Sequence, residues 1–104
     1  MTMFNPPHPG GIIAESLEDL ALSINAAARA LGVAPSTLSR VMRGESAISP
    51  EMAVKLEAAG IGTARHWLAM QSGYDLWHAQ QDTDVSAIKT LFKAPDMPAQ
   101  PNPL

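Results

Sequence analysis

The sequence predicts an all-α domain of five short helices between proline-rich ends. Alanine, a strong helix former, provides 17 of the 104 residues, whereas Val and Ile, which favour strands, number only ten together. Seven of the nine prolines lie before residue 10 or after residue 94, and the other two stand where helices begin. We therefore expect one small domain (10–80), an N-terminal arm (1–9) and a flexible, disordered tail (94–104).

Two helices, each with one apolar face, are predicted in the first third of the chain. The first runs from about Gly10 to Leu20. The second follows Ser23, whose hydroxyl suits an N-cap, and ends at Gly32, because glycine readily adopts the left-handed conformation that terminates helices. Apolar residues recur at helical spacing in both: Ile13, Leu17 and Leu20 in the first, and Ile24, Ala27, Ala28 and Leu31 in the second. These two stripes are expected to face the core.

A third helix is predicted from Pro35 to Gly44, since the first residue of a helix does not need the N–H that proline lacks. Its apolar side carries Leu38, Val41 and Met42. The remaining surface consists of Ser36, Thr37, Ser39, Arg40 and Arg43. This helix therefore has a polar, basic outer face without acids.

Two further helices complete the predicted domain. The fourth starts at Ser49 and Pro50 and stops at Gly60, and the fifth is capped by Thr63 and runs over 64–80. The fourth turns Ala53 and Leu56 inward, and the fifth carries Trp67, Leu68, Tyr74 and Trp77. We expect these large side chains of the fifth helix to pack in the core, and one side of that helix is a candidate dimer interface.

Residues 81–93 are predicted to form either a short helix or a segment that binds a dimer partner or another protein. Ile88, Leu91 and Phe92 fit a helical stripe with Asp84 as its cap. A helix of this length is unstable alone, so the first alternative requires a surface for it to pack against.

The segment from Leu22 to Gly44 is typical of a helix-turn-helix motif. Small Ala28 stands where the two helices pack, Gly32 supplies the turn, and Val33 is the apolar residue within it. In such motifs the second helix enters the major groove of DNA by its N-terminal residues. The net charge of the whole chain is −3, but residues 20–44 contain three arginines and no acid, which leaves −6 for the remainder. The overall charge thus conceals a positive segment.

Arg40 is the leading candidate for reading bases, because only a guanidinium presents a bidentate donor pair to guanine O6 and N7. The candidates for base contact are Ser36, Thr37, Ser39 and Arg40. The candidates for phosphate contact are Ser23, Asn25, Pro35 and Arg43, where Ser23 and Pro35 mark helix starts with free N–H groups. The alternative interpretation is an ordinary helical hairpin in which Arg40 is a solvated surface residue.

The sequence offers no catalytic or metal site, and we expect neither enzymatic activity nor a cofactor. There is no Cys, which excludes thiol nucleophiles and disulfides and fits a reducing cytoplasm. The three histidines lack the spacing of a helical metal pair, and no phosphate-binding glycine loop occurs. No apolar run approaches the ~18 residues of a membrane-spanning helix, so no membrane partner is expected.

Several segments together resemble HigA-type antitoxins, a group within the Xre and Cro/lambda-repressor family. They are His8-Pro9-Gly10, the run LSINAAARALGV from Leu22, the run PSTLSRVMRG from Pro35, Ile48 to Met52, Trp67-Leu68 and Tyr74-Asp75-Leu76. The resemblance covers about residues 8–92. It implies a lambda-repressor-like fold and a dimeric repressor that binds its own double-stranded operator and neutralises a RelE-like, mRNA-cleaving toxin. That toxin would be basic, which suits the acidic remainder of this chain.

The chain departs from that family pattern at two positions that concern DNA. Ile24 replaces a Gln that usually holds a phosphate, and Glu45 follows Gly44 where Lys or Arg is common. Glu45 would repel a nearby phosphate. Gly11 and His66 also depart from the pattern without bearing on the fold. Two alternative functions stay open: a stand-alone repressor without a toxin, and a protein-interaction module that no longer binds DNA.

Overall fold

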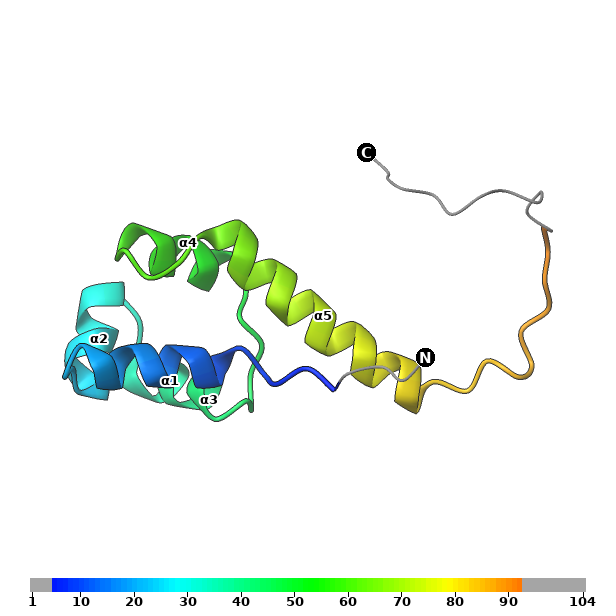
Figure 1. Ribbon diagram of the computed structural model, residues 1–104, viewed down its shortest axis with the longest axis horizontal. Coiled ribbons are helices and arrows are strands. Elements are labelled where there is room, and N and C mark those ends of the chain that lie inside the picture. The colour runs from blue at the N-terminus through cyan, green and yellow to red at the C-terminus, as the bar shows by residue number, and fades with distance from the viewer. Residues whose placement is uncertain (1–4, 93–104) are drawn as a thin grey trace.

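The computed structural model describes residues 5–92 and consists there of five α-helices and no strand (Figure 1). The helices are α1 (Gly10–Asp19), α2 (Ile24–Leu31), α3 (Pro35–Met42), α4 (Pro50–Ala58) and α5 (Ala64–Asp82). The predicted all-α class and helix order are confirmed. The proposed tail 94–104 and the first four residues of the arm lie outside the described part of the chain.

The predicted helix starts and stops are formed by local hydrogen bonds. The hydroxyls of Ser23, Ser49 and Thr63 each accept from the backbone N–H three residues on, at 3.1, 3.1 and 3.2 Å. Gly32 ends α2 with φ +71, in the left-handed region that favours glycine. Pro35 is the first residue of α3, as predicted. These short-range signals position the helix pair.

The core is one cluster of buried apolar side chains from all five helices and the loop before α4. Its members are Ile13, Leu17, Ala27, Ala28, Leu31, Leu38, Val41, Ile48, Met52, Ala53, Leu56 and Trp67. The prediction that Leu20 would share this core is wrong, because α1 ends at Asp19 and the Leu20 side chain is 56% exposed. Ile24, at the start of α2, is also largely on the surface. Both residues belong to helix ends, where the apolar stripe no longer faces the core.

The start of α1 packs against the end of α3 through Gly10. A Cβ atom at this position would lie 1.8 Å from the carbonyl oxygen of Val41, so only glycine fits. The Gly10 N–H donates to Nδ1 of half-buried His8 at 2.9 Å. The His8 ring also packs edge-on against Tyr74 of α5, with centroids 4.8 Å apart. The last residues of the arm are therefore built into the domain, below α5 in Figure 1.

The long helix α5 is attached to the core by Trp67 and Gln71. Trp67 is buried and its indole N–H donates to the carbonyl of Ile61 at 2.6 Å. Gln71, the only buried polar residue in the described chain, accepts from the Ile48 N–H at 2.9 Å and donates to Asp75 at 2.9 Å. Gln71 thereby fixes the loop between α3 and α4 against α5, a role that the sequence did not reveal.

Of the two alternatives predicted for residues 81–93, the short helix does not form: α5 ends at Asp82, and no helix follows it up to Phe92. The segment 85–92 contains a single turn, closed by the Ile88 N–H on the Val85 carbonyl at 3.0 Å. The Asp84 carboxylate accepts from the Ser86 N–H at 2.9 Å and so stabilises the turn, not a helix start. No helix forms because the segment has no neighbouring surface to pack on, and all its residues are exposed.

The environment of His8 leads us to expect that the stability of this domain depends on pH in mild acid. Burial is the main cause that lowers the pKa of His8 below its ordinary value of 6.5, and it outweighs the opposing effects of Asp75 and of the Ser46 backbone. As the pH falls below about 6.5, His8 binds a proton in the unfolded chain more readily than in the folded protein. We therefore expect the free energy of unfolding to fall as the pH drops from about 7 to about 5.5.

Urea unfolding at several pH values measures this dependence, and His8→Asn is the matched variant. An asparagine oxygen can still accept from the Gly10 N–H but does not titrate in this range. The variant should therefore show a flatter profile than the parent between those pH values. Identical profiles for the two proteins would show that His8 is not the responsible group.

Candidate nucleic-acid interface

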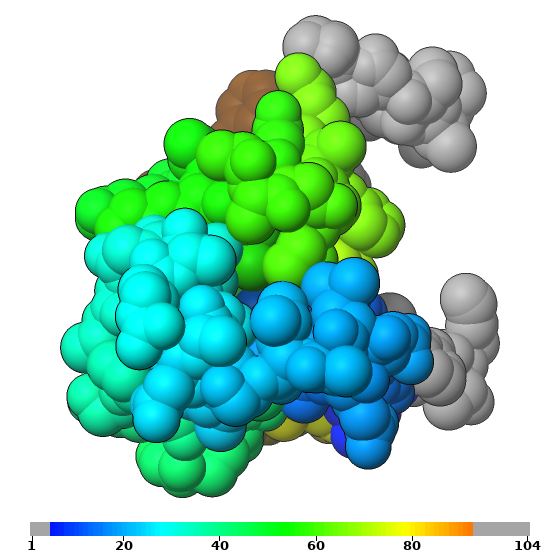
Figure 2. Space-filling view, turned by 90° about the vertical axis from the view of Figure 1, so that its left-hand side faces the viewer, coloured from blue at the N-terminus to red at the C-terminus, as the bar shows by residue number. Residues whose placement is uncertain are grey.

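Helices α2 and α3 pack on each other around the tight turn at Gly32 and Val33, and both contribute to one side of the surface. Ala27 and Ala28 of α2 are buried in the core, and their small side chains allow a neighbouring backbone to approach closely. Figure 2 shows α2 in cyan and α3 in blue-green side by side on this face, with α4 above them. The expected helix-turn-helix geometry is confirmed.

The start of α3 is exposed and rich in hydrogen-bond donors. Leu38 and Val41 bury one side of the helix, and this leaves Ser36, Thr37 and Arg40 on the surface. Ala34 is the N-cap and offers no side-chain acceptor, so the N–H groups of Ser36 and Thr37 have no hydrogen-bond acceptor in the described chain. Free N–H groups at a helix start attract anions such as phosphate.

The start of α2 places two more of the predicted phosphate-binding residues on the surface. Asn25 is exposed in the first turn, next to the Ser23 cap. The Ser23 oxygen accepts from the Ala26 N–H, and its hydroxyl hydrogen remains able to donate. Arg29, one of the three arginines of the positive segment 20–44, is exposed in the last turn of α2. The structure thus presents these groups to solvent, where they are accessible to a partner.

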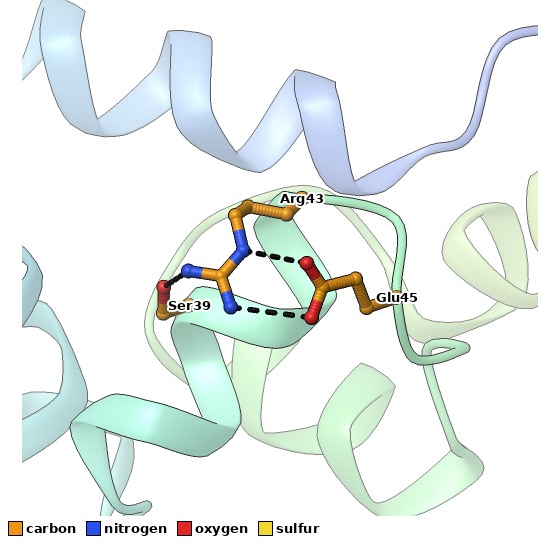
Figure 3. A network of polar contacts seen from close by, with 3 residues as sticks. All are labelled: Ser39, Arg43 and Glu45. Atoms are coloured by element: carbon orange, nitrogen blue, oxygen red, sulfur yellow. Dashed lines mark hydrogen bonds and ion pairs between the residues drawn. The ribbon is translucent and has the colours of Figure 1, made fainter.

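Arg43, a further predicted phosphate contact, is held by a network within the chain (Figure 3). Its Nε and Nη2 atoms donate to the two carboxylate oxygens of Glu45 at 2.9 and 3.2 Å. Its Nη1 donates to the hydroxyl of Ser39 at 2.6 Å. Gly44, with φ +77, and the bond from the Glu45 N–H to the Arg40 carbonyl at 2.8 Å turn the chain so that Glu45 faces Arg43.

This network changes the charge of the surface around α3. Arg43 and then Arg40 lower the pKa of Glu45, so the carboxylate remains charged near neutral pH. Glu45 pairs with Arg43, and this reduces the positive charge that Arg43 can offer to a phosphate. Ser39 was predicted to contact bases, and its hydroxyl oxygen accepts a hydrogen bond from Arg43. Arg40 remains as the exposed arginine of α3 without such a bond in the described chain.

Among residues 5–92 no group of three or more His, Asp or Glu side chains is placed to hold a metal ion. None of the helices in this range is both long enough and apolar enough to cross a membrane.

The packing of α2 and α3 and the exposed, donor-rich start of α3 define a DNA-binding domain of the helix-turn-helix class. The helix-turn-helix family matches residues 13–60. The chain belongs to the HigA-type antitoxins within the helix-turn-helix family of the Xre and Cro/lambda-repressor type.

The relatives behind this assignment cover most of the chain. The HTH-type transcriptional regulator YddM of Escherichia coli K12 is 43% identical over 91 residues, which are 88% of this chain and 97% of the relative. Antitoxin HigA-1 of Vibrio cholerae is 34% identical and covers 75% of each chain. The solved structure of antitoxin GraA in complex with its operator has a TM-score of 0.77 and 31% identity, and it covers 89% of this chain and 98% of its own.

Proposed function

We propose that this protein is the antitoxin of a type II toxin-antitoxin pair and that it represses its own operon as a homodimer on double-stranded operator DNA. The observation that carries the proposal is the exposed start of α3. The backbone N–H groups of Ser36 and Thr37 are free there, and the side chains of Ser36, Thr37 and Arg40 are exposed. Relatives solved with operator DNA support the same conclusion. The protein would act in the cytoplasm as a non-catalytic regulator.

In this proposal α3 lies in the major groove and α2 crosses the backbone. Arg40 reads guanine by its bidentate donor pair, and Ser36 and Thr37 contact neighbouring base edges. The helix starts at Ser23 and Pro35, together with Asn25, hold phosphates. Ser39 and Arg43 contribute to the same surface through their mutual hydrogen bond.

Footprinting on the DNA upstream of the gene tests the homodimer on its operator. A symmetric dimer must protect two half-sites of opposite orientation, about 10 base pairs or ~34 Å apart. A single protected half-site would contradict the dimer. Absence of protection at low salt would contradict the repressor function. The protein-interaction module that no longer binds DNA would then be the remaining interpretation.

The toxin partner is proposed to be basic and of the RelE-like, mRNA-cleaving type. The support from this chain is its charge distribution, because the residues outside 20–44 carry a net charge of −6. A surface of this sign attracts a basic partner and speeds its association. Co-expression with the protein encoded beside the gene should restore growth that the neighbour alone arrests. A neighbour without such toxicity would favour the stand-alone repressor.

Replacing Glu45 should strengthen DNA binding by this domain. Glu45→Ala removes the acceptor of two Arg43 hydrogen bonds and one negative charge beside α3. Arg43 then becomes free to hold a phosphate, which steepens the negative slope of log K against log salt by about 0.9 per subunit, or about 1.8 for the dimer. Fluorescence anisotropy at several salt concentrations measures both the affinity and this slope.

The control is Asp82→Ala, which removes an exposed acid at the end of α5 whose side chain makes no hydrogen bond or ion pair in the described chain. It should leave the slope unchanged. If Glu45→Ala behaves like this control, Arg43 does not reach a phosphate when it is released.

A further inference from the structure

A groove between the loop before α4 and the outer side of α5 is open on the surface of the domain. It has a volume of about 630 Å³, and its apolar walls include Ile48, Pro50, Leu68 and Leu76. The Leu76 side chain is 58% exposed at this groove. Asp75 adds a carboxylate to the lining. The groove therefore combines apolar surface with one negative charge.

The segment after α5 has the complementary character. Four large apolar side chains are exposed there: Val85 64%, Ile88 73%, Leu91 98% and Phe92 77%. Lys89 stands among them and carries a positive charge. Soluble proteins rarely expose so many apolar side chains together unless another surface covers them.

We propose that residues 85–92 of one copy lie in this groove of a second copy, and reciprocally, so that exchanged segments close the dimer. The inference rests on the homodimer of the proposed function and names the surface that forms it. Leu91 and Phe92 would cover the apolar walls, and Lys89 would approach Asp75. A two-fold axis repeats each contact, so both segments are covered at once.

The direction of the chain favours a second copy over the same copy. Thr83 is extended after the end of α5, with φ −100 and ψ 120. The chain then runs away from the domain, as the yellow-to-orange trace in Figure 1 shows. Docking in its own groove would require the segment to reverse at this point. Docking in a partner requires no such reversal.

The lengths of the two surfaces also agree. Residues 88–92 follow the turn that is closed between Val85 and Ile88, and five extended residues span about 16 Å at ~3.3 Å each. The groove follows α5 from Leu68 to Ala79, and these eleven steps of ~1.5 Å give about 16 Å. Residues 88–92 in extended form are therefore about as long as the groove.

The chain contains no Cys, which permits a direct cross-linking test. Ile88→Cys marks the segment, and Ala47→Cys and Ala79→Cys mark two positions of the groove lining. We expect equal mixtures of the segment variant with one of the groove variants to give disulfide-linked heterodimers in excess of either homodimer. The control is Glu18→Cys on exposed α1, which should not cross-link to the segment.

Other results of this test would overturn the inference. A chain carrying both Ile88→Cys and Ala79→Cys that forms its disulfide within a monomer would place the segment in its own groove. A stable dimer without these cross-links would mean that another surface joins the copies. Operator binding by such a dimer would leave the proposed function standing. Loss of these cross-links on addition of a toxin, with a new cross-link from Ile88→Cys to the toxin, would assign the segment to that partner.

Sedimentation of an unlabelled variant gives an independent measurement. Leu91→Asp should raise the dimer dissociation constant by at least about 30-fold, as expected for a buried apolar anchor. Leu20→Asp is the matched control, because Leu20 is an exposed leucine at the opposite end of the domain sequence. Equal dissociation constants for the two variants would contradict the exchange.

Discussion

Gly10→Ala should be among the most destabilising single substitutions in this domain. The added Cβ would lie 1.8 Å from the carbonyl oxygen of Val41, and backbone atoms cannot move aside as a flexible side chain can. The end of α3 or the start of α1 must therefore shift. We expect a loss of at least about 3 kcal/mol in the free energy of unfolding. Thermal unfolding should show a midpoint lowered by about 12 °C or more.

Gly11→Ala is the matched control for this prediction. No atom lies within 4 Å of a Cβ at Gly11, which is a helical residue of α1. Alanine is better than glycine in a helix by about 1 kcal/mol, so this variant should be as stable as the parent or more stable. Equal effects of the two substitutions would show that α1 and α3 do not pack through Gly10.

Arg40→Ala should weaken binding to the specific operator by about 1 to 3 kcal/mol, with a much smaller loss on random DNA. Arg40 is exposed on the face of α3 and makes no ion pair in the described chain, so its guanidinium is available to a base. A contact to a base is lost only where that base is present, whereas a phosphate contact is lost on every sequence. Anisotropy with both DNAs measures the difference.

Arg65→Ala is the control for Arg40, because it removes an exposed arginine of α5 outside the helix pair. It should change neither affinity nor selectivity by a comparable amount. Equal losses on specific and random DNA for Arg40→Ala would mean that Arg40 holds a phosphate. In that case the base contacts of α3 would have to come from Ser36 or Thr37.

The parts of the fold that the sequence predicted correctly depend on short-range signals. The cap at Ser23 and the left-handed end at Gly32 involve atoms within a few residues, so local pattern determines them. The predicted burial of Leu20 and the short-helix alternative for residues 81–93 were wrong for the opposite reason. Their apolar spacing is helical, but whether such side chains are buried depends on a surface far away in sequence or in another molecule.

The candidate site was predicted in outline, without its internal contacts. The polar face of α3 follows from helical periodicity alone. The pairing of Arg43 with Glu45 depends on the turn at Gly44, which brings the next residue back toward the helix. The sequence alone led us to expect that Glu45 repels a nearby phosphate. In the structure the Glu45 carboxylate instead forms an ion pair with Arg43. The buried bridge through Gln71 spans 23 residues and has no local signal.

The most direct test of the central claim is the affinity of the unmodified protein for its own upstream DNA compared with a shuffled fragment of equal length. Anisotropy over a range of salt concentrations yields both affinities and both salt slopes. We expect the upstream fragment to bind at least about 10³-fold more tightly, with an affinity that falls as salt rises. Equal affinities for the two fragments, or no binding at low salt, would contradict sequence-specific DNA recognition through α3.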